Sequence, residues 1–181
     1  MPKPITSAAP TSPEPLPSGE TLLALERQAR LGGTGLKASD LEGLWLLQRV
    51  WTRGRPDPSA LSGGLLRGLR ASLRIEAVAS PSPSPSAAPL RLTNSVQLGP
   101  LELRFQGPGW LRGRRPLLGF QFERLEIRAG ERVLLHKDLP APQPRRQPFF
   151  ALIATGPDRG WLAARGRGGG LAVWCLSPPP P

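Results

Sequence analysis

The sequence has few of the residues that form disulfides, metal centres and catalytic pairs. Its 181 residues include one cysteine, Cys175, one histidine, His136, and no tyrosine. One cysteine cannot form an internal disulfide, and with one histidine it cannot supply a usual zinc site. The aspartates and glutamates are scattered through charged segments, without the spacing of a catalytic carboxylate pair. The composition therefore predicts that the protein is not an enzyme and needs no cofactor and no metal ion.

Long apolar runs are also absent. No stretch approaches the roughly 18 apolar residues of a membrane-spanning helix. Residues 1–19 have no apolar centre and a single basic residue, Lys3, so they fit neither a secretory signal nor a typical transit peptide. We expect a cytoplasmic protein that is soluble or binds a membrane from one side.

Acidic residues are outnumbered in this chain. It has 24 lysines and arginines against 13 aspartates and glutamates, a formal net charge of +11, and arginine is far more frequent than lysine. A GC-rich genome would also produce such an arginine excess. A strong positive charge favours contact with anionic lipid, nucleic acid or acidic proteins, but it does not choose among them.

The 24 prolines and 21 glycines are concentrated in a few segments. Residues 1–17 and 177–181 are rich in proline and are expected to be disordered tails. Residues 80–89 alternate serine and proline and are expected to form a mobile loop. The remaining span, 18–176, has enough apolar segments for one domain.

One short helix is expected at the start of this domain, over residues 18–31. Ser18 stands at a capping position, Leu22, Leu25 and Ala29 recur at helical spacing, and Gly32-Gly33 ends the run. Residues 61–69 fit either a helical turn or an irregular segment.

After the helix, apolar residues alternate with polar ones, which is the pattern of half-buried strands. Gly107-Pro108-Gly109 is expected to break one strand, and a phase slip at Glu123-Arg124 indicates a β-bulge. The expected strands lie at 42–51, 71–78, 90–98, 101–106, 118–127, 132–136, 149–155, 161–165 and 171–176. Eight or nine short strands with short connections predict a mainly β, antiparallel fold, either a sandwich or a closed barrel. We favour the barrel, because closure removes exposed strand edges and about eight strands can enclose one small ligand.

Three segments carry a family resemblance. Residues 41–47 are similar to an opening Gly-x-Trp-x-Leu strand, and residues 93–122 to a central asparagine followed by apolar strands. Residues 158–174 are similar to a closing motif with an aspartate-bearing loop, Arg-Gly-x-x-Gly and an apolar strand. With these segments the chain resembles the plastid lipid-associated proteins, also called fibrillins, of plastids and cyanobacteria. The residues that agree with the closing motif are Asp158, Arg165, Gly166 and Gly169.

The chain departs from that family at some positions. Gly160 and Leu162 stand where an acidic and a basic residue are usual, and the family's tyrosine after the first tryptophan has no counterpart. The resemblance implies a lipocalin-like barrel that associates peripherally with thylakoid or plastoglobule lipid. It also implies an apolar ligand such as a lipid, quinone, carotenoid or fatty acid.

The large aromatic side chains are the residues expected to face the barrel interior. They either fill the core or line a ligand cavity, depending on the width of the barrel. These candidate ligand-binding residues are Trp45, Phe105, Phe120, Phe122, Phe149, Trp161 and Trp174.

Asp158 and Arg165 flank Trp161 and are expected to meet across a hairpin turn, as a structural ion pair or with Arg165 holding a ligand carboxylate. The glycines of 166–170 resemble a phosphate-binding loop only superficially. They lack the Gly-Lys-Ser/Thr ending and precede a strand, so a hairpin turn explains them better.

Residues 110–115 combine a tryptophan, a leucine and three arginines in an expected loop. This composition is typical of an interfacial membrane anchor, although an ordinary solvated loop has it too. The residues of this membrane-surface patch are Trp110, Arg112, Arg114 and Arg115.

The sequence thus favours non-enzymatic binding of an apolar small molecule, with peripheral association to an anionic membrane. The resemblance implies that this membrane is photosynthetic. One alternative is single-stranded nucleic-acid binding, which requires exposed aromatics interleaved with cations. Phe120 and Phe122 lie in leucine-lined strands and are expected to be buried, so nucleic acid is not the expected partner. A second alternative is a bilin-lyase-like lipocalin fold. The oligomeric state is left open.

Overall fold

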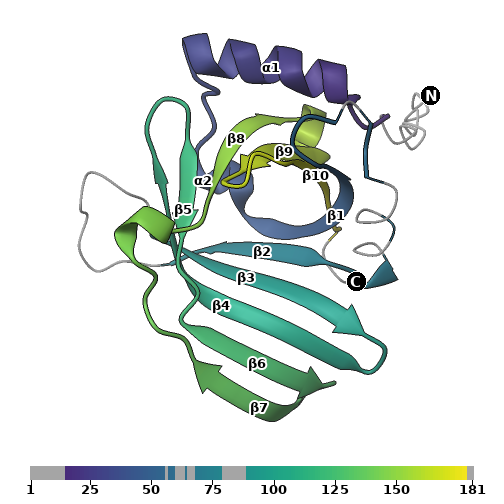
Figure 1. Ribbon diagram of the computed structural model, residues 1–181, viewed down its shortest axis with the longest axis vertical. Helices are drawn as coiled ribbons and strands as arrows, with labels where there is room; N and C mark the ends of the chain where they lie inside the picture. Colours follow the sequence, from purple (N-terminus) through teal and green to yellow (C-terminus); the bar gives the residue numbers. More distant parts are fainter. Residues whose placement is uncertain (1–14, 56, 60–63, 65–67, 79–88, 179–181) are drawn as a thin grey trace, which may run out of the picture.

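The computed structural model describes residues 15–55, 57–59, 64, 68–78 and 89–178. The chain is mainly β, with one long helix and ten strands among these residues (Figure 1). The predictions for residues 1–14, 80–88 and 179–181, and most of those for 61–69, lie outside the described residues.

The predicted N-terminal helix is confirmed as α1, Gly19–Gly32. The Ser18 side chain accepts a hydrogen bond from the Thr21 backbone N–H, which satisfies one of the free donors at the helix start. Gly33 has φ 83° and its N–H donates to the Ala29 carbonyl, so the helix ends at a residue that tolerates the left-handed region. A second, four-residue helix, α2, covers Ala38–Leu41.

Most strands lie close to their predicted positions. Their bounds are β1 Gly43–Trp51, β2 Ser72–Ala77, β3 Pro89–Leu98, β4 Leu101–Arg112, β5 Leu117–Phe120, β6 Arg124–Ala129, β7 Arg132–Asp138, β8 Phe149–Thr155, β9 Trp161–Gly166 and β10 Leu171–Leu176. Two short 3-10 turns lie at Pro144–Arg146 and Pro157–Arg159.

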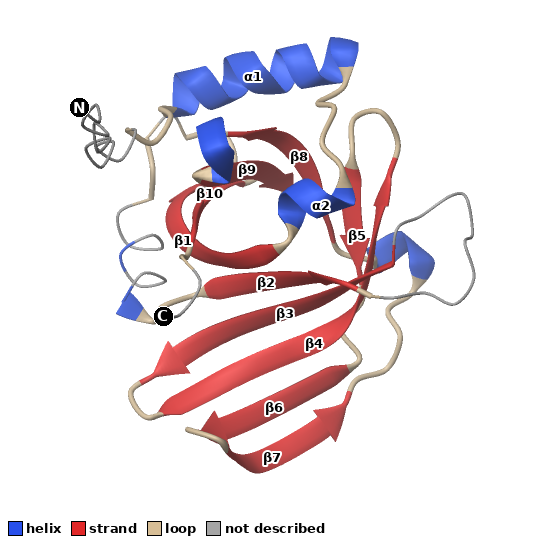
Figure 2. Cartoon of the chain, turned by 180° about the vertical axis from the view of Figure 1, so that it is seen from behind, coloured by secondary structure: helices blue, strands red, loops and turns tan. Residues whose placement is uncertain are grey.

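Eight of these strands form a closed antiparallel barrel that is consistent with a lipocalin-like fold. Its order is β1-β2-β3-β4-β5-β8-β9-β10, and β10 pairs again with β1. The remaining two, β6 and β7, lie outside this circle. They continue the sheet from the first half of β4, so that β3, β4, β6 and β7 form a broad extension below the barrel (Figure 2). We call residues 94–98 of β3, 101–106 of β4, β6 and β7 the wing.

Two strand predictions are wrong at the point where the wing leaves the barrel. Gly107-Pro108-Gly109 does not end a strand, because β4 continues to Arg112. The phase slip near Glu123 is not a bulge but a change of strand: residues 121–123 cross over between β5 and β6. The Gln121 N–H donates to the Pro108 carbonyl (3.0 Å) and the Glu123 N–H to the Gln106 carbonyl (2.8 Å). A Cβ on Gly107 would overlap the Gln121 carbonyl, so glycine permits this close crossing.

Two apolar clusters stabilise the barrel. The interior cluster includes Trp45, Ile75, Leu92 and Leu118, and α2 contributes Leu41 to it. The Trp45 indole N–H donates to the Leu41 carbonyl at 2.6 Å, which ties this cluster to α2. The second cluster lies on the outside of the barrel beneath α1. Its buried members are Leu22, Trp51, Ile153, Trp161, Ala163, Leu171 and Val173.

Candidate functional site

The barrel interior is densely packed around three of the predicted ligand-binding residues. Trp45 is fully buried, and Phe120 and Trp174 are each 6% exposed. Such low exposure is typical of a close-packed core. These three rings therefore fill the core at their end of the barrel.

Two of the predicted interior residues face outward instead. On β9 the inward positions are Leu162 and Ala164, so Trp161 points to the outer surface, where α1 covers it. Both faces of β9 are buried, and such a strand has no alternation in its sequence. On β8 the inward ring is Phe150, which packs against Trp174, and its neighbour Phe149 points outward.

Five aromatic rings form a continuous row. The centroid of Trp174 lies 5.4 Å from Phe150, Phe150 lies 5.2 Å from Phe120, Phe120 lies 5.1 Å from Phe122, and Phe122 lies 5.6 Å from Phe105. Phe122 and Phe105 are only half-buried, and Phe105 belongs to the wing. The row therefore connects the barrel core with one face of the wing.

That face of the wing is apolar across four strands. In an antiparallel sheet, directly paired residues point to the same side. The registers of β3, β4, β6 and β7 place nine apolar side chains on this side, together with Asn94, Arg132 and Lys137. The nine apolar residues are Val96, Leu98, Leu101, Leu103, Phe105, Leu125, Ile127, Ala129 and Leu135. We call this surface the apolar face. Its leucines Leu98, Leu101 and Leu135 are 51%, 37% and 53% exposed.

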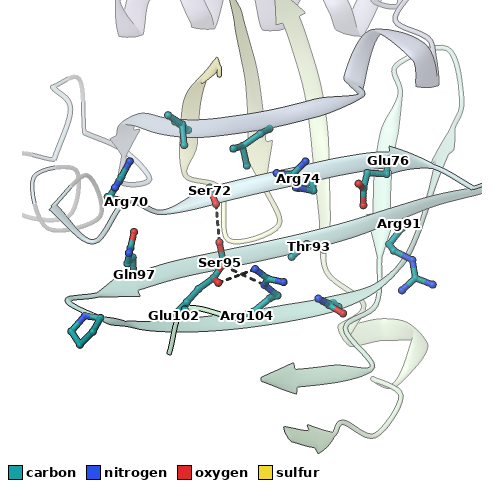
Figure 3. Close-up of a pocket in the computed structure, with 15 residues that line it drawn as sticks. Arg70, Ser72, Arg74, Glu76, Arg91, Thr93, Ser95, Gln97, Glu102 and Arg104 are labelled. Atoms are coloured by element: carbon teal, nitrogen blue, oxygen red, sulfur yellow. Dashed lines mark hydrogen bonds and ion pairs between the residues drawn. The ribbon is translucent and has the colours of Figure 1, made fainter. Parts of the chain in front are cut away.

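The opposite side of the same strands is polar. Figure 3 shows this side where it continues over β2 and β3, with a hydrogen bond of 2.8 Å between the Ser72 and Ser95 hydroxyls. Arg104 pairs with Glu102 at 2.8 Å, and on β6 Arg128 pairs with Glu126 at 3.2 Å. Many of the polar side chains on this surface are thus paired with one another, and a polar surface of this kind is suited to contact with water.

A groove of about 550 Å³ runs along the polar side. Three of the arginines that line it, Arg70, Arg74 and Arg91, have no ion pair with any residue the structure describes (Figure 3). No aromatic side chain is among the described residues that line it. Bases of single-stranded nucleic acid would therefore have no ring to stack on in this groove.

The arginine of the closing motif has a partner that sequence reasoning missed. Arg165 binds Glu26 of α1 through Nε at 2.8 Å and through Nη2 at 2.6 Å, and not Asp158 as predicted. Glu26 is 3% exposed and also contacts Arg115 at 2.9 Å and Arg30 at 3.0 Å. The hydrogen bonds from Arg165, partly opposed by burial and assisted by Arg30, lower the pKa of Glu26 to about 2. Asp158 lies in the turn before β9, at φ 49°.

The glycines of the closing motif form the β9–β10 hairpin turn, as predicted. The Gly166 N–H donates to the Gly170 carbonyl and the Gly169 N–H to the Gly166 carbonyl, both at 2.9 Å. The Gly169 carbonyl also accepts from Arg165, so the turn helps to orient the guanidinium that binds Glu26.

The predicted membrane-surface patch is divided in the structure. Trp110 and Arg112 lie on β4 rather than in a loop, and the Arg112 guanidinium lies 5.5 Å from the Trp110 ring. Arg114 is exposed in the following turn, where it donates to the Gly32 carbonyl at 3.4 Å. Arg115 turns toward Glu26 and so leaves the patch.

His136 and Cys175 lie on different strands. His136 is exposed on β7, and Cys175 is half-buried on β10, where burial raises the pKa of its thiol. The described residues contain no cluster of three potential metal ligands. No helix within the described part of the chain is long and apolar enough to cross a bilayer.

No protein-family model, no curated protein and no solved structure matches this chain. The resemblance to the fibrillins therefore stays a prediction from the sequence.

Proposed function

We propose that this protein is a non-enzymatic lipid-binding protein that docks on anionic membrane surfaces through the apolar face of the wing. The observation that carries the proposal is the two-sided character of the wing. One side presents nine apolar side chains together with Asn94, Arg132 and Lys137, and the other presents ion pairs and hydroxyls alongside Val133. Large exposed apolar patches with a polar rim are typical of interaction surfaces.

Burial of the exposed leucines in lipid would contribute to the free energy of membrane binding. Full burial of one leucine side chain is worth about 1.5–3 kcal/mol. Leu98, Leu101 and Leu135 are about half exposed, so their transfer into lipid contributes about 2–4 kcal/mol in total. Arg132 and Lys137 lie at the β7 edge of the same face, opposite Ala129 and Leu125. Each adds about 1 kcal/mol when it lies close to an anionic surface.

A small apolar molecule would bind at the same place. The interior rings Trp45, Phe120 and Trp174 are packed, whereas Phe105 and Phe122 are half-buried at the junction with the wing. A quinone, carotenoid or fatty acid would therefore lie along Phe105 and Phe122 rather than deep in the barrel. The resemblance to the fibrillins favours photosynthetic membranes as the source of both lipid and ligand.

Co-sedimentation with vesicles tests the docking. Leu135 and Val133 lie on the same strand and are similarly exposed (53% and 42%). The register of β7 shifts between them, so that Leu135 pairs with Ile127 and Val133 with Arg128, and the two side chains therefore point to opposite sides of the wing. We expect wild-type protein to bind vesicles of phosphatidylcholine and phosphatidylglycerol. Leu135→Asp should weaken binding at least tenfold, because it removes apolar contact and adds an anion, whereas Val133→Asp should change it less than about twofold. Equal effects of the two substitutions would contradict the proposal.

A further inference from the structure

A second candidate site lies on the outer surface of the barrel, away from the wing. It is a pocket of about 310 Å³ between β4, β5 and the start of β8. Its walls come from Trp110, Leu117 and Phe149, and its charged groups are Arg112, Arg145 and Arg167. We call it the basic pocket.

The charges of the basic pocket are uncompensated. None of the described lining residues is acidic, and none of the three arginines forms an ion pair with a described residue. Arg167 is held in place, since its guanidinium donates to the carbonyls of Arg145 and of Gln147. Arg112 is steadied by the Trp110 ring, 5.5 Å away. Guanidinium groups favour an oxygen-rich anion, and their planar forks match a phosphate or a carboxylate.

The walls of the pocket indicate what is attached to the anion. Trp110, Gly119 and Phe149 stand opposite one another on three adjacent strands. Because Gly119 has no side chain, the Trp110 indole lies over it, and a Cβ there would approach the indole nitrogen to 2.5 Å. Arg112 also packs against the Trp110 ring. The ring therefore has little free surface on which a nucleobase could stack. Phe149 is half-buried, and Leu117, 42% exposed, adds an aliphatic rim.

We propose that the basic pocket binds the phosphate of an anionic lipid headgroup, with the glycerol and the first acyl carbons against Leu117 and Phe149. A volume near 300 Å³ suits one headgroup rather than a large ligand. This inference goes beyond the docking proposed for the wing, because the pocket uses different strands and the outer side of the barrel.

Calorimetric titration with water-soluble dihexanoyl phosphatidylglycerol, used below its micelle concentration, tests the pocket without any membrane. We expect saturable binding to the wild-type protein. The double substitution Arg112→Gln and Arg145→Gln should weaken it at least tenfold, because both arginines bind through their side chains. The matched control is Arg91→Gln in the polar groove, an exposed arginine that likewise lacks an ion pair among the described residues. It should leave the affinity unchanged within about twofold.

Three further ligands identify the source of the phosphate. Dihexanoyl phosphatidylcholine, whose net charge is zero, should bind at least tenfold more weakly. Glycerol 3-phosphate should also bind more weakly, because it lacks the acyl carbons; equal affinity would replace the lipid with a free phosphate ester. Tighter binding of a thymidine oligonucleotide, lost in the same double variant, would assign the pocket to nucleic acid. No binding of the soluble lipid, or an equal loss of affinity in the Arg91→Gln control, would overturn the inference. The vesicle experiment with Leu135→Asp tests docking by the wing independently of this result.

Discussion

Replacing Glu26 with glutamine would remove the charge that holds α1 against the barrel. Glu26 is the acceptor for Arg165, Arg115 and Arg30, and two of these, Arg115 and Arg165, have side chains only 29% and 23% exposed. Loss of one partner from a fully buried ion pair costs about 3–5 kcal/mol. Because solvent still reaches these arginines, we expect a smaller loss of unfolding free energy, about 2–3 kcal/mol.

The ion pairs of Glu26 also make the stability of the protein depend on pH. The pKa of Glu26 is about 2 in the folded chain against an ordinary value of 4.5. The unfolded state therefore binds a proton first as the pH falls, so the stabilisation is complete above about pH 5 and is lost progressively toward pH 2. At about 1.4 kcal/mol for each tenfold change in proton affinity, this contact stabilises the folded state by about 3 kcal/mol at neutral pH.

Urea unfolding followed by tryptophan fluorescence, repeated between pH 7 and pH 3, measures both effects. Glu20→Gln, an exposed acid in the first turn of the same helix, is the matched control and should cost only about 0.5 kcal/mol. Glu26→Gln should be less stable at neutral pH and should lose less stability on acidification than the wild type. A variant that matches the wild type at pH 7, or that keeps its full acid sensitivity, would refute the reasoning.

Other contacts lead to equally specific expectations. Gly107→Ala should lower the unfolding free energy in urea by at least about 2 kcal/mol, because the added methyl overlaps the Gln121 backbone at the crossing. Trp45→Phe leaves the buried Leu41 carbonyl without its donor, so the same assay should show a loss of about 2–4 kcal/mol; a loss below about 1 kcal/mol would contradict the role given to that bond. Cys175 should react with a thiol reagent at neutral pH more slowly than a cysteine in the urea-unfolded chain, because burial raises the pKa of its thiol; equal rates would contradict this.

Much of the barrel could be predicted from the sequence because most strands have one side that faces the core and one that faces solvent. Leu101, Leu103 and Phe105 alternate with charged residues, and β4 begins where this pattern begins. The alternation fails where both sides of a strand are covered, as at Trp161 beneath α1, and it cannot choose between adjacent rings such as Phe149 and Phe150.

The contact between α1 and the barrel has a signal in the sequence. Glu26 lies four residues after Leu22 and three before Ala29, on the face of the helix that is buried. A carboxylate on such a face requires a cationic partner. The identity of that partner depends on the fold, because Arg165 is 139 residues away in the chain. Likewise, the sequence alone could not show where the wing leaves the barrel. One continuous strand, β4, belongs to both, because it pairs with β6 over residues 101–106 and with β5 over residues 109–112.

The most direct test of the central claim is the depth of the two sides of the wing in a bilayer. Spin labels would be attached at position 135 or 133, through Leu135→Cys or Val133→Cys, after replacement of Cys175 by serine. Collision rates with oxygen, which concentrates in lipid, and with a nickel chelate, which stays in water, would be measured with and without anionic vesicles. We expect the label at 135 to gain oxygen collisions and lose nickel collisions on vesicle binding, and the label at 133 to keep its aqueous values. A label at 135 that stays in water, or labels that enter the lipid equally, would contradict docking by the apolar face.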